Sequence, residues 1–405
     1  MSPDATGAPE VVSLFSGAGG LDIGLERAGW VTAVATDLAS DSMETLRLSQ
    51  SRNIGIPGSD RSYLEGTNLL EADIRELSRA DLTPEGRPDD WRPDLMVGGP
   101  PCQPWSSAGS QRGLSDPRGQ LIAHMIRLIG EMRPRYVIFE NVRGLVTAGG
   151  KDGTPGEMLR SIQSDLQDVG YASRISTLNS ADFGAGQRRV RLILLASTDR
   201  SLPEYPIPTH DRKGENSRLP WVSLRDMLAT VPEPLPEDVV KPSGERAQAL
   251  ELLTPGTGIK TGGRATANRP GGHWGYRQDS FLADLSLPSR TIRAASTPDW
   301  VRLPGESMRR LTWRECAVLQ GFPTEWQFHG PMSSRFTQIG NAVQVDVAHA
   351  LGEAIGKALS DDTHTNPTSP AWPSELIKRV RYTENEHRIN GRPVPRNSKL
   401  LIAAS

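Results

Sequence analysis

The sequence has few of the residues that bind metals, form disulfides or cross membranes. Its 405 residues include only two cysteines, Cys102 and Cys316, which are too few for a disulfide framework. The seven histidines do not cluster with them at metal-ligand spacing, so no metal site is expected. No apolar run reaches about 18 residues, and the N-terminal MSPDATGAPE lacks the pattern of a secretory signal. We therefore expect a cytoplasmic protein without a membrane partner.

An excess of one charge is also missing, because the formal net charge is only -2. Lysine is scarce and supplies only seven of the 46 basic residues. Arginine suits bidentate contacts to phosphate or guanine, although codon bias in a GC-rich genome would give the same excess. Residues 260–314 hold more Lys and Arg than Asp and Glu. This local excess is typical of a phosphate-binding face, with an ordinary charged surface as the alternative.

Residues 11–200 alternate between short apolar runs and helical patterns. Strands are expected at 11–15, 31–37, 95–97, 136–140 and 190–196. Helices are expected around Leu21–Ala28 and from an N-cap at Asp116 and Pro117 through Met132. Strands that alternate with helices indicate an α/β fold, a doubly wound, Rossmann-like parallel sheet.

The pattern changes near residue 200, where Pro, Gly and Arg become frequent and clear periods disappear. We expect a first domain at 1–200 and a second, smaller irregular domain at 201–329. A helical return segment at 330–360 completes the first domain. The tail at 361–405 is rich in Pro, Thr and Asn, and we expect it to be poorly ordered.

Residues 13–24, SLFSGAGGLDIG, run from a strand through glycines into a helix, which places N–H groups beside a ligand. The dinucleotide fingerprint needs a third glycine where Asp22 stands, which favours a nucleoside without a pyrophosphate. Asp37 lies 20 residues after Gly17 and could accept both ribose hydroxyls. Asp73, where a third strand is expected to end, could accept from an adenine amino group. The alternative is a tight turn with two solvated acids.

Cys102 follows two glycines and two prolines at the carboxyl end of a strand, where open α/β sheets bind ligands. A thiolate is a strong nucleophile near neutral pH. A buried, inert cysteine is the alternative, although the flanking Pro, Gln and Ser are not an apolar run. Cys316 lies on an apolar helical stretch, and we expect it to be inert.

Glu140 closes the apolar strand YVIFE, where its pKa is expected to be raised, so that it could donate a proton. A hydrogen-bonded structural acid is the alternative. Gln187, Arg189 and Arg191 form a QxRxR pattern at the start of a strand. Strand alternation would put both arginines on one face, which could equally be a solvated basic face.

Six short motifs occur in a specific order: FSGAGG, GGPPCQPWS, ENV, QRRVR, RECAVLQGFP and QIGNAV. In these motifs the chain resembles the cytosine-C5 DNA methyltransferase family over roughly residues 11–357. The resemblance implies S-adenosylmethionine as the methyl donor and cytosine in duplex DNA as the substrate. It makes 1–200 the catalytic and cofactor-binding domain and 201–329 the target-recognition domain.

The resemblance also implies which residues line the cofactor: Phe15, Gly17, Gly19, Gly20, Leu21, Asp37, Asp73, Ile74, Gly99, Pro101, Leu121, Asn341 and Val343. Three positions depart from the family pattern. Asp37 stands where the family usually has Glu, Gln344 stands in place of a proline, and Gly186 replaces the proline of PQxRxR. None of these changes removes a group that the reaction needs.

The implied chemistry begins with attack of the Cys102 thiolate on carbon 6 of cytosine, which makes carbon 5 nucleophilic. Glu140 would act at ring N3, with Arg191 and Arg189 holding the carbonyl and orienting Glu140. The base must flip out of the duplex, and the polar stretch 103–119 is expected to close over it. The expected DNA-contacting residues are Ser106, Gln111, Arg264, Arg269, His273, Trp274, Tyr276, Arg277 and Arg290.

The expected partners are duplex DNA and a cognate restriction endonuclease that acts on the same site, and we expect a bacterial or phage-encoded monomer. One alternative is the RNA-methylating branch of the superfamily, whose members tend to carry a Cys-Phe-Thr tripeptide that this sequence lacks. A second is a non-catalytic DNA-binding or nucleoside-binding protein, against which Cys102 and Glu140 count. An NAD-dependent dehydrogenase is a distant third.

Overall fold

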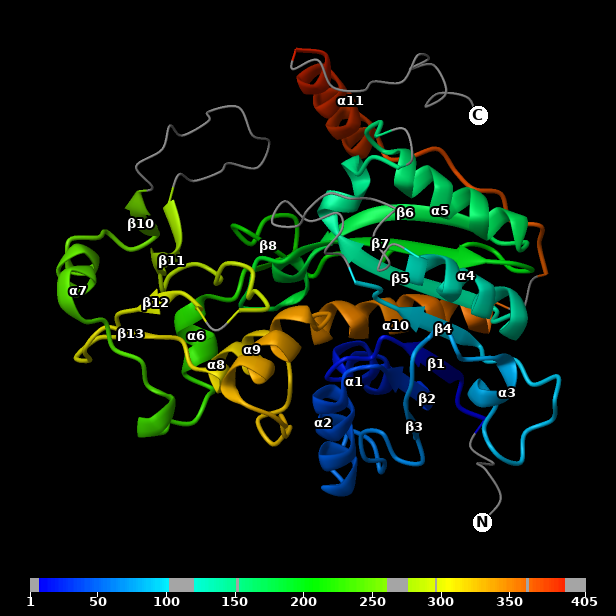
Figure 1. Cartoon of the computed structure of the whole chain (residues 1–405), viewed down its shortest axis with the longest axis horizontal. Coiled ribbons are helices and arrows are strands. Elements are labelled where there is room, and N and C mark those ends of the chain that lie inside the picture. The colour runs from blue at the N-terminus through cyan, green and yellow to red at the C-terminus, as the bar shows by residue number, and fades with distance from the viewer. Residues whose placement is uncertain are drawn as a thin grey trace. The chain divides into compact units, whose positions relative to one another are not determined.

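The computed structural model describes residues 7–101, 120–150, 153–260, 276–295, 297–361 and 364–389. The chain forms two compact units (Figure 1). The first contains Met1–Leu178, Val190–Ile207 and Val347–Ser405, and the second contains Asn179–Arg189 and Pro208–Asp346. Among the described residues, no helix combines the length and apolar character needed to cross a membrane.

A seven-stranded sheet forms the centre of the first unit, in the order β3-β2-β1-β4-β5-β7-β6. Its strands are β1 (Glu10–Leu14), β2 (Val31–Asp37), β3 (Asn68–Glu71), β4 (Leu95–Gly98), β5 (Tyr136–Val142), β6 (Ala172–Asn179) and β7 (Val190–Ser197). The strands β1 to β5 pair in parallel, as predicted. The strand β7 runs antiparallel to β5, which the expectation of a parallel sheet missed.

Helices cover both faces of this sheet: α1 (Gly20–Arg27), α2 (Ser40–Ser51), α3 (Arg79–Leu82), α4 (Gln120–Met132), α5 (Glu157–Asp168), α10 (Val345–Ser360) and α11 (Ser374–Ile389). Alternation along β5 sends Val137 and Phe139 into one apolar core with α4 and α5. Tyr136 points the other way and donates a hydrogen bond to the Ala358 carbonyl of α10 at 3.0 Å. Figure 1 shows α4 and α5 over one face and α10 over the other.

The strand order changes direction between β1 and β4, which are neighbours in the sheet. The glycine turn follows β1, and residues 99–101 follow β4. Ligands bind at such a switch point, beyond the carboxyl ends of the strands. The fold therefore brings the two sequence motifs together at one edge of the sheet, which confirms the α/β prediction.

The expectation of a poorly ordered tail is wrong for residues 364–389. There α11 places Leu376 and Val380 in the same core as Leu145 and Val146 of the short helix η2 (Arg143–Thr147). Trp372 adds a hydrogen bond from Nε1 to Oε1 of Gln163 at 2.6 Å. The apolar spacing in this segment is one residue per helical turn, too sparse to stand out in the sequence.

The second unit is built from short elements: η3 (Ser180–Phe183), β8 (His210–Asp211), β9 (Leu219–Pro220), α6 (Leu224–Leu228), η4 (Pro236–Asp238), α7 (Gly244–Glu251), β10 (Thr257–Lys260), β11 (Tyr276–Leu282), β12 (Trp300–Val301), β13 (Arg309–Arg310), α8 (Trp313–Leu319) and α9 (Met332–Asn341). Strands β10 to β13 form one sheet around Leu250, Leu282, Trp300 and Met308. Its small core agrees with the irregular sequence of this region.

Candidate active site

The turn after β1 adopts backbone conformations that leave space for a ligand. Phe15 and Gly17 both have a φ of 55°, and Gly19, with a φ of 90°, precedes the first turn of α1. No atom lies within 4 Å of the place where a Cβ of Gly17 would be. Gly20 and Leu21 begin α1, so the N-terminus of this helix opens at the turn.

Asp37, at the end of β2, holds this turn through its carboxylate. Its Oδ2 accepts a hydrogen bond from the Gly17 N–H at 2.9 Å, and its Oδ1 accepts one from the Ala39 N–H at 2.8 Å. Burial raises the pKa of Asp37, and these N–H groups offset part of that effect. Each carboxylate oxygen has a second lone pair, so Asp37 can also accept from ribose hydroxyls.

Asp73 lies two residues beyond β3 rather than at its end. The Arg75 side chain donates from Nε to Oδ1 of Asp73 at 2.9 Å, and the Arg75 N–H donates to the same oxygen at 2.9 Å. The hydrogen bonds from Arg75 lower the pKa of Asp73 to about 2. Asp73 is therefore an anionic acceptor at neutral pH, as an adenine-binding acid must be.

The other predicted cofactor residues occupy several elements. Ile74 is buried in the core of the first unit, and Leu121 on α4 packs against that core. In the second unit, Asn341 ends α9 with an exposed side chain, and Val343 is buried in the following turn. Gln344, which replaces the family's proline, is buried and donates to Asp346 at 2.7 Å.

Buried Glu140 and half-buried Arg191 form an ion pair on adjacent strands. Arg191 is in register with Val142, two residues beyond Glu140 on the same face of β5. The Arg191 Nε lies 3.0 Å from Oε1 of Glu140. The raised pKa expected for Glu140 from the sequence stays a prediction. The pair offers a carboxylate and a planar donor group side by side.

The segment after β4 approaches Glu140 closely. A Cβ on Gly99 would lie 3.1 Å from Oε2 of Glu140, so only glycine gives that carboxylate its full space. Asn141 is buried and donates from Nδ2 to the Pro100 carbonyl at 3.1 Å. Sequence reasoning gave Asn141 no role. Its position next to Glu140, in a strand that otherwise reads apolar, was the available signal.

Cys102 lies outside the described residues, as do Ser106, Gln111, Arg264, Arg269, His273 and Trp274. Tyr276 and Arg277 belong to β11, and their side chains are not described. Pro101 is the last described residue before Cys102. The second cysteine, Cys316, is buried in α8, and burial raises the pKa of its thiol, as expected for an inert side chain.

Arg189 has partners that differ from those predicted. The expectation that it shares a strand face with Arg191 is wrong, because β7 begins at Val190. Its guanidinium donates to the carbonyls of Ile292, Gly340 and Ala342 at 2.9, 2.8 and 2.8 Å. The side chain is buried and binds main chain within the second unit.

Gln187 completes this arrangement by accepting the Ile292 N–H at its Oε1, at 2.8 Å. Gln187 and Arg189 therefore bind the main-chain N–H and the main-chain carbonyl of Ile292. Gln187 also donates to Oε1 of Gln320 at 2.9 Å. Gly186, in place of the family's proline, leaves room for Met227, whose Cγ lies 2.1 Å from where a Cβ would be.

Arg290, a predicted DNA contact, is engaged within the second unit. Its Nε donates to Oδ2 of Asp299 at 2.9 Å, and the guanidinium lies 3.7 Å from the ring centre of Phe281. Its contact with DNA stays a prediction.

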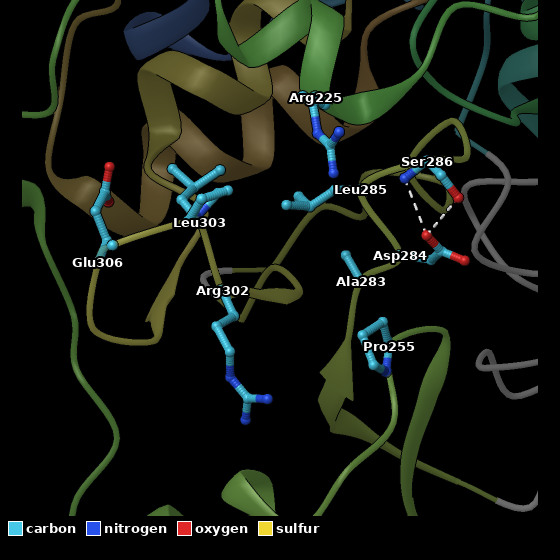
Figure 2. Close-up of a pocket in the computed structure, with 11 residues that line it drawn as sticks. Arg225, Pro255, Ala283, Asp284, Leu285, Ser286, Arg302, Leu303 and Glu306 are labelled. Carbon is cyan, nitrogen blue, oxygen red and sulfur yellow. Dashed lines mark hydrogen bonds between the residues drawn. The ribbon is translucent and has the colours of Figure 1, made fainter.

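Figure 2 shows an open pocket of about 440 Å³ in the same unit. Arg225, Asp284, Arg302 and Glu306 line it. The carboxylate of Asp284 accepts from the hydroxyl of Ser286 at 2.7 Å, drawn as a dashed line. Because two arginines and two acids line the pocket, it is not the basic surface expected for phosphate.

Comparison with known proteins decides the family. The family described as C-5 cytosine-specific DNA methylase matches residues 10–357. The chain belongs to this family. The match includes the glycine turn, the Glu140–Arg191 pair and the late motif with Asn341, so the resemblance inferred from the six motifs is confirmed.

Characterised relatives cover most of the chain. Type II methyltransferase M.NgoFVII of Neisseria gonorrhoeae is 31% identical over 362 residues, covering 87% of this chain and 88% of the relative. Type II methyltransferase M.FnuDI of Fusobacterium nucleatum is 28% identical over 376 residues, covering 87% and 95%. Among solved structures, the S. pombe Dnmt2 methyltransferase aligns with a TM-score of 0.59 at 19% identity, covering 87% and 99%. This structural likeness supports the fold.

The family uses S-adenosylmethionine, and the described residues fit it. Gly17 leaves open space at the helix N-terminus, Asp37 presents a carboxylate at the end of β2, and Asp73 presents one two residues beyond β3. These acids suit ribose hydroxyls and an adenine amino group, while the turn lacks the third glycine of a pyrophosphate site. The protein is therefore an S-adenosylmethionine-dependent methyltransferase.

Proposed function

We propose that the protein is a DNA (cytosine-5-)-methyltransferase that forms a covalent bond between Cys102 and carbon 6 of a flipped cytosine. The observation that supports this most directly is the pair of buried Glu140 and half-buried Arg191, 3.0 Å apart, at the carboxyl edge of the sheet. Asn141 anchors Pro100, two residues before Cys102, to the same strand. The acid and the cation thus lie at one sheet edge, to which the chain just before Cys102 is also attached.

In this proposal the Cys102 thiolate adds to carbon 6, and the electron pair of the 5,6 double bond moves toward N3 and the carbonyl oxygen. Glu140 in its protonated form donates a hydrogen bond to N3, where the negative charge develops, and Arg191 donates to the carbonyl oxygen while holding Glu140 in place. Bound S-adenosylmethionine supplies an electrophilic methyl group to carbon 5. Loss of the carbon-5 proton to a base and expulsion of the thiolate then restore the ring. Arg189, whose guanidinium also donates to three main-chain carbonyls, stays a predicted second contact to the carbonyl oxygen.

The cytosine must leave the duplex, because carbon 6 is not accessible to a side chain within the stack. We propose that the second unit selects the target sequence, with its sheet of β10 to β13 as the scaffold. Residues 201–329 would then be the target-recognition region, and 1–200 with 330–360 the catalytic domain. The relatives are named Type II methyltransferases, which supports duplex DNA as substrate and a cognate restriction endonuclease as partner. The monomeric state stays a prediction.

A trapping experiment tests this proposal. The protein is incubated with S-adenosylmethionine and a pool of long duplexes of varied sequence that contain 5-fluorocytosine, whose carbon 5 cannot release its fluorine. We expect a denaturation-resistant adduct that Cys102→Ala abolishes and the matched control Cys316→Ala retains. An otherwise identical reaction with tRNA should give no adduct. Cofactor binding without an adduct on any DNA would overturn the covalent mechanism, and an adduct only with tRNA would transfer the activity to RNA.

A further inference from the structure

The helix α11 lies beyond the family match, which ends at residue 357, yet it is built into the first unit. It packs against η2, the short helix that directly follows β5. Val380 of α11 lies 3.3 Å from the Cβ position of Gly156, beside the Val146 carbonyl of η2. This helix is visible at the top of the first unit in Figure 1. The chain has therefore added a helix next to the strand that carries Glu140.

Two arginines belong to these two packed elements. Arg143 begins η2, and Arg379 precedes the buried Val380 on α11. Within the described parts of the chain, neither guanidinium has an acidic or hydrogen-bonding partner, and Nε of Arg379 is enclosed. Burial and the charge of Arg143 both lower the pKa of Arg379. Placing two like charges together in a partly desolvated position is unfavourable unless an anion lies between them.

The position indicates which anion this is. Arg143 follows Glu140 by three residues, so the chain between them spans at most about 10 Å. A cytosine bound at Glu140 carries a phosphate on each side of its sugar. The guanidinium fork matches phosphate oxygens, and paired arginines are a common way to bind them.

We propose that Arg143 and Arg379 form a phosphate-binding site for the DNA strand that carries the target cytosine. This inference rests on the proposed function. It gives α11 a role in DNA binding in addition to the recognition expected from the second unit. Phosphate contacts of this kind position the nucleic acid without reading its sequence.

The test measures duplex affinity against salt for the full-length protein and for Arg143→Ala and Arg379→Ala. Each lost phosphate contact should lower the slope of log K against log salt by about 0.9. Arg379→Lys should keep the slope, because it keeps the charge, while it weakens binding. Arg388→Ala, an exposed arginine near the end of the same helix, is the matched control and should leave slope and affinity unchanged.

The outcomes separate this inference from the proposed function. If the wild type and both alanine variants bind duplex DNA with the same dependence of log K on log salt, the phosphate site is overturned. The methyltransferase proposal is then unaffected. A slope that falls in Arg388→Ala as well would show a general effect of charge and also overturn it. Adduct formation with 5-fluorocytosine DNA is measured on the same preparations. Its loss in the wild-type protein would overturn the proposed function instead.

Discussion

Asp22 and Glu26, one turn apart on α1, allow a sharp test of the energetics of the glycine turn. Both side chains are buried. Burial raises the pKa of Asp22 from 3.8 to about 6, and that of Glu26 from 4.5 to about 7, although Leu64 donates a hydrogen bond to Glu26 at 2.8 Å. The helix that carries the cofactor turn therefore contains two acids that resist ionisation.

Because burial raises both pKa values, the folding stability that depends on these acids falls as the pH rises. Below pH of about 4 Asp22 is neutral in the folded and unfolded chains and has no effect on stability. As pH rises toward about 6, the unfolded chain ionises first and gains stability relative to the folded protein. A pKa raised from 3.8 to about 6 corresponds to about 3 kcal/mol, which is lost by the time Asp22 ionises in the folded state.

The substitution Asp22→Asn removes this term while keeping the shape of the side chain. Urea unfolding is followed for the wild type and the variant at intervals between pH 4 and 8. The variant should become more stable than the wild type as pH rises, by up to about 3 kcal/mol. The exposed Asp60→Asn serves as the control and should run parallel to the wild type. Parallel curves for Asp22→Asn would refute the assignment of a buried, hard-to-ionise acid at this position.

Three further substitutions test the packing and the site. Gly340→Ala places a Cβ 2.2 Å from the backbone of Arg293, so we expect thermal melts to show misfolding or a loss of about 3 kcal/mol in folding stability. Gly356→Ala places its Cβ in open space on a helix and should raise folding stability by about 0.5–1 kcal/mol. Asp37→Asn should weaken S-adenosylmethionine binding about tenfold or more in calorimetry, because the amide cannot replace the charged acceptor. Glu140→Gln should slow methylation by about 100-fold or more in single-turnover assays with unchanged DNA affinity. An unchanged S-adenosylmethionine affinity in Asp37→Asn, or an unchanged methylation rate in Glu140→Gln, would contradict these roles.

Much of the first unit could be predicted because its signals are local. Parallel strands buried on both faces appear as apolar runs, and the turn after β1 shows its glycines directly. The antiparallel direction of β7 could have been inferred from the ten residues that separate it from β6, since a parallel crossover needs about a dozen or more. Arg191 faces Glu140 because of this direction, so the pairing depends on topology rather than on spacing alone.

The remaining features depend on contacts between distant segments. Arg189 binds carbonyls that lie more than 100 positions away, at Ile292 and Gly340, and no local pattern records such partners. Arg75 beside Asp73 is a short-range contact, but its side chain could equally have pointed into solvent. The order in α11 comes from tertiary packing of a few apolar residues, which a sparse pattern does not reveal.

If the second unit selects the target sequence, as proposed, the division of the chain has a consequence for changing that sequence. The second unit is not one continuous insertion, because Asn179–Arg189 belongs to it together with Pro208–Asp346. A chimera that exchanges only the longer piece would set a foreign segment against Gln187 and Arg189, which hold Ile292 at both its N–H and its carbonyl. We expect functional transplants between relatives to require both pieces from one parent. The unit to exchange is therefore the pair of segments rather than the longer one alone.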